Sequence, residues 1–130
     1  LTKADHIPSD SFDCIILTQT LQLIYDVRGA IQTVHRILKP GGVVLATVPG
    51  ISQTYDGEWG GTWYWSFTPL SASCLFREAF SPDQVEIDVL GNVLAATAFL
   101  QGMAAEELTP SELQHRDHAY AVTIAILATK

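Results

Sequence analysis

One segment gathers many of the side chains that could bind a flat or ring-shaped ligand. Residues 49–69 hold all three tryptophans and half of the aromatic residues of the chain. A loop of about 20 residues is long for a compact domain and commonly lines or covers a binding site. We therefore expect its rings to stack on a substrate; the alternative is that they only cover one end of a sheet. The candidate substrate-binding residues are Tyr55, Trp59, Trp63, Tyr64 and Trp65.

The other reactive side chains form no pattern typical of a catalytic or metal site. The sequence contains no Gly-x-Gly, no P-loop and no nucleophile elbow. His115 and His118 have helical spacing, but no third ligand lies nearby in sequence, so no metal site is expected. His6 could serve as a base, with a solvated histidine as the alternative. No residue is assigned as catalytic.

The elements that must position these residues begin with two buried strands. Residues 14–18 and 43–48 are continuous apolar runs, which are typical of strands buried on both faces. Asp26 is placed to cap a helix between them, and the helix ends before Pro40. Its apolar face consists of Val27, Ala30, Ile31, Val34 and Leu38. This pattern predicts a βαβ unit with parallel strands and a right-handed crossover.

The second half of the chain predicts a mixed sheet. Thr68 and Pro69 have the types expected at the start of a helix. Residues 85–89 alternate apolar and acidic side chains, which indicates an edge strand. Residues 92–108 are apolar nearly all round, which predicts a helix covered on most sides. Residues 120–128 are apolar on both faces, so this last strand is expected inside the sheet.

Two blocks of sequence resemble class I S-adenosylmethionine-dependent methyltransferases. Residues 7–16, Ile-Pro-Ser-Asp-Ser-Phe-Asp-Cys-Ile-Ile, resemble the approach to the fourth strand of that family. Residues 36–45, Arg-Ile-Leu-Lys-Pro-Gly-Gly-Val-Val-Leu, resemble its helix-to-fifth-strand segment. The resemblance covers nearly all of residues 1–130 as one partial domain, strands four to seven. It implies an α/β, Rossmann-like mixed sheet with helices on both faces and an antiparallel inserted last strand.

The same resemblance implies S-adenosylmethionine as cofactor and a small-molecule acceptor. By position, the loop before the fourth strand approaches the adenine, and the residues after that strand line the cofactor. The candidates are Asp5, Thr18, Gln19 and Thr20. The alternatives are that Asp5 is a solvated loop residue and that the other three only end a strand. Residues 63–69 and 91–96 also look similar to methyltransferase domains found near sugar-transfer enzymes, which suggests a sugar-related acceptor.

The sequence departs from the family because the first strand and its Gly-x-Gly loop have no counterpart. The chain also starts at Leu1 rather than methionine, so we expect a fragment or a processed product that is inactive alone. The rival hypothesis is a non-enzymatic half-domain that oligomerises. Without the first strand, the edge of strand 14–18 would be unpaired, which predicts a homo-oligomer or a partner chain there. A dehydrogenase-like enzyme would not explain the inserted last strand.

Composition excludes two classes of partner. The net charge is −7 and the seven Lys and Arg residues are scattered, which argues against nucleic-acid binding. No apolar stretch approaches the roughly 20 residues of a membrane-spanning helix. Cys14 and Cys74 lie in apolar stretches and are expected to be buried free thiols of a cytoplasmic protein.

Overall fold

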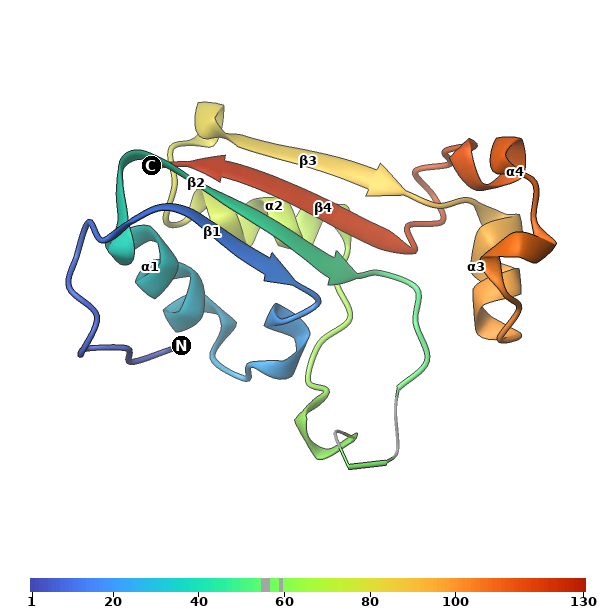
Figure 1. The fold of residues 1–130 in the computed structure, drawn as a ribbon, viewed down its shortest axis with the longest axis horizontal. Coiled ribbons are helices and arrows are strands. Elements are labelled where there is room, and N and C mark those ends of the chain that lie inside the picture. Colours follow the sequence, from blue (N-terminus) through green and yellow to red (C-terminus); the bar gives the residue numbers. More distant parts are fainter. Residues whose placement is uncertain (55–56, 59) are drawn as a thin grey trace.

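The computed structural model describes residues 1–54, 57–58 and 60–130 and folds them around a mixed four-stranded sheet (Figure 1). The strands are β1 (Phe12–Thr18), β2 (Leu38–Pro49), β3 (Val85–Leu90) and β4 (Thr123–Thr129), in the spatial order β1-β2-β4-β3. β1 and β2 are parallel, and β4 is antiparallel to both β2 and β3. The α/β, Rossmann-like mixed sheet and its antiparallel inserted last strand are therefore confirmed.

The helices begin where the sequence offers capping side chains. They are α1 (Val27–Ile37), α2 (Pro69–Arg77), α3 (Val93–Leu100) and α4 (Pro110–Gln114). The Asp26 carboxylate accepts from the backbone N–H of Gly29 at 3.0 Å, which satisfies a free donor at the start of α1. Thr68 and Ser71 form a reciprocal capping box at the start of α2.

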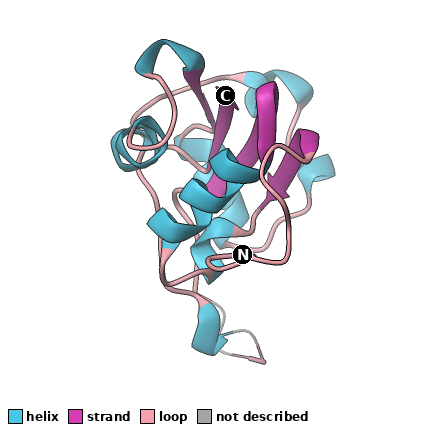
Figure 2. Ribbon diagram, turned by 90° about the vertical axis from the view of Figure 1, so that its left-hand side faces the viewer, coloured by secondary structure: helices cyan, strands magenta, loops and turns pink. Residues whose placement is uncertain are grey.

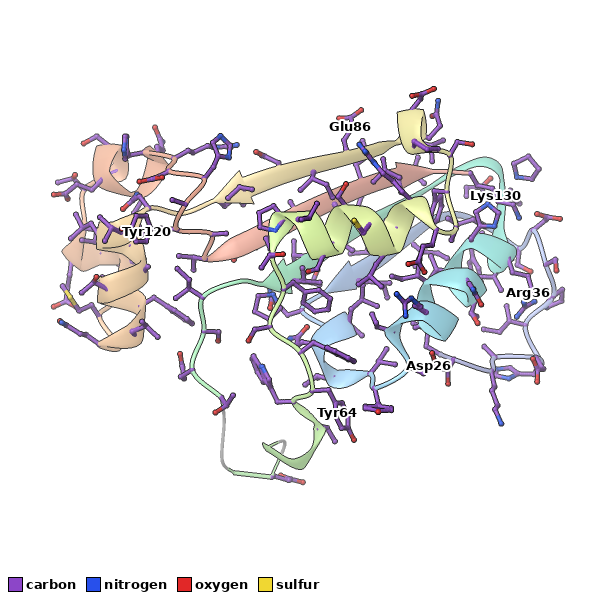
Figure 3. The ribbon with its side chains drawn as sticks, turned by 180° about the vertical axis from the view of Figure 1, so that it is seen from behind. Asp26, Arg36, Tyr64, Glu86, Tyr120 and Lys130 are labelled. Carbon is purple, nitrogen blue, oxygen red and sulfur yellow. The ribbon has the colours of Figure 1, made fainter. Side chains whose placement is uncertain are left out.

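The core lies between one face of the sheet and the helices α1 and α2, which lie in front of the strands in Figure 3 and behind them in Figure 1. The largest fully buried side chains are Leu21, Ile31, Val34, Leu38, Val44, Val48, Phe76 and Ile124. On the other face of the sheet, Ile16 and Leu45 are 68% and 45% exposed. Helices were expected on both faces of the sheet. In the described part of the chain, α1 and α2 cover one face, whereas α3 and α4 pack on each other beyond the end of the sheet.

Three expectations about burial are wrong. Strands 14–18 and 43–48 were expected to be buried on both faces, but each has one exposed face, because the described helices α1 and α2 cover only the other side of the sheet. The helix expected over residues 92–108 ends at Leu100 and leaves that residue 54% exposed, since α3 projects past the sheet and has little to pack against. Both cysteines are free, as expected, but exposed. Cys14 lies on β1, whose side chains are mostly exposed, and Cys74 lies on the solvent side of α2.

The segment that follows β2 leaves the sheet and returns to begin α2 (Figures 1 and 2). Its first residue, Gly50, packs against the backbone of Ala121, just before β4. The backbone N–H of Gly50 donates to the carbonyl of Val122 at 3.0 Å, and that of Ile51 donates to the carbonyl of Ala121 at 2.7 Å. The start of the segment 49–69, called here the aromatic segment, is therefore fixed to the start of β4.

This close approach makes Gly50→Ala a destabilising substitution. A Cβ at position 50 would collide with the carbonyl oxygen of Ala121, whereas a Cβ at Gly61 would meet open space. We expect Gly50→Ala to lower the free energy of unfolding by about 1–3 kcal/mol, as overpacking does. The control Gly61→Ala should change it by less than about 0.5 kcal/mol. Urea unfolding followed by circular dichroism measures both, and equal values for the two variants would contradict the proposed contact.

Candidate functional site

The carboxyl ends of β1 and β2 lie at the same edge of the sheet because the two strands are parallel. β1 ends at Thr18, and Gln19 then adopts a left-handed backbone with φ of 48°. The backbone N–H of Gln19 donates to the carbonyl of Thr47 on β2 at 3.0 Å. The Thr20 hydroxyl donates to the carbonyl of Thr18 at 3.0 Å. Three of the predicted cofactor-binding residues, Thr18, Gln19 and Thr20, therefore lie together.

The fourth, Asp5, lies at the other end of the sheet. Arg36, near the end of α1, donates to the carbonyls of Ala4 and Ile7 at 3.0 and 2.8 Å, which holds the loop on both sides of Asp5 (Figure 3). α1 leads directly into the start of β2, which pairs with the start of β1. Seven residues of extended strand, roughly 20 Å, separate that end from Thr18. The structure does not bring Asp5 to the other candidates.

A pocket of about 650 Å³, called here the strand-end pocket, opens beside Gln19. Its lining combines apolar side chains with uncharged polar ones, and none of the described lining residues is charged. The lining residues are Gln19, Gln22, Leu23, Pro49, Ile51, Ser52, Trp63, Phe99, Val122 and Thr123. Pockets that combine apolar walls with a few polar groups are typical of small-molecule sites.

Gln22 connects the end of β1 to the aromatic segment. Its side-chain Nε2 donates to the backbone carbonyl of Gln19 at 2.9 Å. Its own backbone carbonyl accepts from the backbone N–H groups of Tyr64 and Trp65. Gln22 is 2% exposed, yet its Oε1 has no hydrogen-bond partner among the described residues. The Nε1 of Trp63 is also buried, and none of the described residues accepts a hydrogen bond from it. Gln22 was not among the predicted site residues, although a glutamine within the apolar run Leu21–Ile24 was a signal for it.

The predicted aromatic residues separate into two groups. Trp63 lines the strand-end pocket, whereas Trp65 lines a second pocket of about 740 Å³ between the starts of α1 and α2, called here the helix-end pocket. Tyr64 and Trp65 pack against Tyr25, with ring centroids 5.4 and 6.2 Å apart. The Nε1 of Trp65 donates to the carbonyl of Ile24 at 3.0 Å. Tyr25 was not predicted, and the remaining two candidates, Tyr55 and Trp59, lie outside the described residues.

Charged groups lie at the helix-end pocket and elsewhere on the surface. Arg28 on α1 pairs with Glu78, just beyond α2, at 2.8 Å, and this hydrogen bond and charge raise the pKa of Arg28. Partial burial and the Lys130 ammonium lower the pKa of His35, which lies edge-on against Phe80 and lines neither pocket. Among the described residues, no cluster of three or more His, Cys, Asp or Glu side chains could hold a metal ion. No helix formed by those residues is long and apolar enough to cross a membrane.

The left-handed backbone at Gln19 predicts which substitutions the end of β1 tolerates. We expect Gln19→Val to lower the free energy of unfolding by about 1–3 kcal/mol, because a β-branched residue is strained at positive φ. Gln19→Gly, which removes the same side chain but tolerates this backbone, should cost distinctly less. Thermal and urea unfolding of the two variants measure the difference. Equal losses would mean that the side chain, rather than the turn, carries the stability.

Comparisons with known proteins agree on one fold. A family model described as a methyltransferase domain matches residues 2–80, and no curated protein matches this chain. An S-adenosylmethionine-dependent methyltransferase from Archaeoglobus fulgidus is similar with a TM-score of 0.61 at 11% identity, covering 97% of this chain and 62% of that one. One from Thermotoga maritima is similar with a TM-score of 0.60 at 20% identity, covering 95% and 58%.

A third similar structure is phosphoethanolamine N-methyltransferase 2 from Haemonchus contortus, in complex with phosphomonomethylethanolamine and S-adenosylhomocysteine. Its TM-score is 0.59 at 16% identity, and the match covers 95% of this chain but 35% of that one. This chain therefore spans between about a third and two thirds of the length of the solved structures that it resembles.

Proposed function

Because this chain belongs to the family of methyltransferase domains, we propose that its protein transfers a methyl group from S-adenosylmethionine to a small-molecule acceptor. The observation that carries this proposal is the strand-end pocket, which is lined by Gln19 at the carboxyl ends of two parallel strands. Ligands of open α/β sheets bind at this edge. The polar residues at the end of β1 suit the cofactor, and the uncharged pocket beside them suits the acceptor.

The strand end fits one side of the cofactor. Bound S-adenosylmethionine supplies a methyl group activated by a positively charged sulfur. Thr18 is exposed, and Gln22 leaves a buried oxygen without a partner, so this edge offers hydrogen-bonding groups to a polar ligand. We assign Thr18, Gln19 and Thr20 to cofactor binding. Asp5 is not included, because its loop is tied to the opposite end of the sheet.

The pocket residues would orient the acceptor and exclude water, which is the main requirement of a direct transfer. With the cofactor bound, the acceptor atom would bond to the methyl carbon, S-adenosylhomocysteine would leave, and any proton lost by the acceptor would pass to water. We propose that Trp63 contacts the acceptor together with Phe99, and that Tyr64 and Trp65 contribute a stacking surface nearby, suited to a sugar-related compound.

Binding of S-adenosylhomocysteine is the direct test. We expect calorimetry to show binding by a longer protein that contains residues 1–130 and a Gly-x-Gly loop, and little binding by residues 1–130 alone. Each lost hydrogen bond removes roughly 1 kcal/mol. In the longer protein, Thr18→Val with Gln19→Ala should weaken binding by about fivefold or more. Thr97→Val, on α3, serves as control. If neither the longer protein nor residues 1–130 bound S-adenosylhomocysteine, the methyl-transfer proposal would be overturned.

A second candidate function is association through β1, and the open edge of the sheet favours it. Within the described part of the chain, β1 pairs with β2 alone, and Ile16 on β1 is 68% exposed. An edge strand with free backbone groups and exposed apolar neighbours is a template for pairing with another chain. We propose that residues 1–130 form a homo-oligomer there, in a protein that works in the cytoplasm.

Light scattering after size-exclusion chromatography tests this association. Residues 1–130 should elute as a dimer or larger, and Ile16→Lys should shift the population toward monomer by placing a charge on the apolar edge. Leu70→Lys is the matched control, because Leu70 is 73% exposed but lies on α2, away from that edge. If the unsubstituted chain were monomeric at a protein concentration of tens of micromolar, the proposed association through β1 would be contradicted.

A further inference from the structure

The strand-end pocket is selective against charge. The described lining contains amide and hydroxyl side chains, two aromatic rings and aliphatic groups, with no acidic or basic residue. An ammonium or carboxylate that enters such a pocket loses its hydration without gaining an opposite charge, which is unfavourable. An uncharged ligand avoids that cost.

The Gln22 side chain has only one orientation that suits its surroundings. Its Nε2 donates to the carbonyl of Gln19 at 2.9 Å, and exchanging the amide nitrogen and oxygen would place two acceptors against each other. Oε1 is therefore fixed as an acceptor, buried and without a partner. A buried acceptor without a partner destabilises the protein, so a ligand that donates a hydrogen bond to it would be favoured.

Trp63 supplies the complementary atom. Its Nε1–H can only donate, and it is buried without an acceptor. The matching group of Trp65 is bonded to the carbonyl of Ile24. Trp63 and Gln22 line the same pocket, and each carries one buried polar atom that has no partner among the described residues.

Building on the proposed function, we propose that the strand-end pocket binds an uncharged acceptor through a hydroxyl group, which donates to Gln22 Oε1 and accepts from Trp63 Nε1–H. A hydroxyl carries both a donor and acceptor lone pairs. An ammonium group cannot accept from Trp63, and a carboxylate cannot donate to Gln22. The acceptor class is thus an alcohol or phenol with an apolar body that packs on the rings of Trp63 and Phe99.

Four probes of similar shape separate these chemistries: benzyl alcohol, benzylamine, benzoate and toluene at pH 7. The readout is the indole N–H resonance of Trp63 in the ¹⁵N-labelled protein, assigned with Trp63→Phe. We expect benzyl alcohol to move this resonance downfield and to bind at least about tenfold more tightly than the cationic amine or the carboxylate. Toluene should bind more weakly than the alcohol, without the downfield shift.

Two variants test the named atoms. Gln22→Met keeps the size of the side chain and removes Oε1, and Trp63→Phe keeps a ring and removes the N–H. Each should weaken benzyl alcohol binding by about tenfold and leave toluene binding nearly unchanged, with binding to Trp63→Phe followed by ligand-observed NMR. Trp65→Phe, whose N–H is already bonded within the protein, should change neither. If Gln22→Met does not fold, the probe series and Trp63→Phe carry the test.

Equal or tighter binding of benzylamine or benzoate would overturn the inference. So would a shift of the Trp63 resonance on Gln22→Met without ligand, because the two atoms would then satisfy each other in solution. The S-adenosylhomocysteine titration keeps the two proposals separate. A preference for the alcohol without S-adenosylhomocysteine binding by the longer protein would leave the pocket assignment standing and overturn methyl transfer. The reverse result would overturn only the hydroxyl assignment.

Discussion

The insertion of β4 between β2 and β3 is the constraint on which the rest of this structure depends. Among the described strands, β3 joins the sheet through β4 alone, and β4 pairs with β2 without interruption from Val43 opposite Thr129 to Pro49 opposite Thr123. That register determines which residues meet where β2 ends and β4 begins. It sets Gly50 against Ala121, and so it fixes where the aromatic segment leaves the sheet.

The strand-end pocket inherits its shape from that arrangement. One side comes from the residues after β1, another from the start of the aromatic segment, and a third from α3 and the approach to β4. Gln22 ties the first two together, since its side chain holds Gln19 and its carbonyl receives Tyr64 and Trp65. Residue 22 therefore links positions about 40 residues apart in the sequence, by its side chain on one side and by its backbone carbonyl on the other.

The elements that the sequence predicted well are those with a complete local signal. The apolar runs at β1 and β2, the cap at Asp26 and the doubly apolar β4 each predicted an element that the structure contains. The order of the last two strands followed from two patterns together, the half-polar β3 at the edge and the doubly apolar β4 inside. Thr18, Gln19 and Thr20 could be expected at the carboxyl edge, because the end of a parallel strand determines its edge.

What the sequence could not predict depends on partners distant along the chain. The apolar surface of α3 indicates a tendency to be covered, but it does not indicate whether anything lies against it. The same holds for Cys14 on the open face of the sheet. The distance of Asp5 from the other candidates depends on Arg36, some 30 residues later, which holds its loop. The unpaired atoms of Gln22 and Trp63 are visible only once both side chains line one pocket.

The order of the strands also determines how the chain can fold during its synthesis. β2 ends at Pro49, but its second neighbour, β4, does not begin until Thr123. At ribosomal rates of about 5–20 residues per second, several seconds or more separate the two. Throughout that interval β2 has a free edge and β3 has no sheet to join. An unpaired apolar strand edge is prone to associate with other chains, so we expect nascent chains of this topology to aggregate more readily before β4 is made than afterwards.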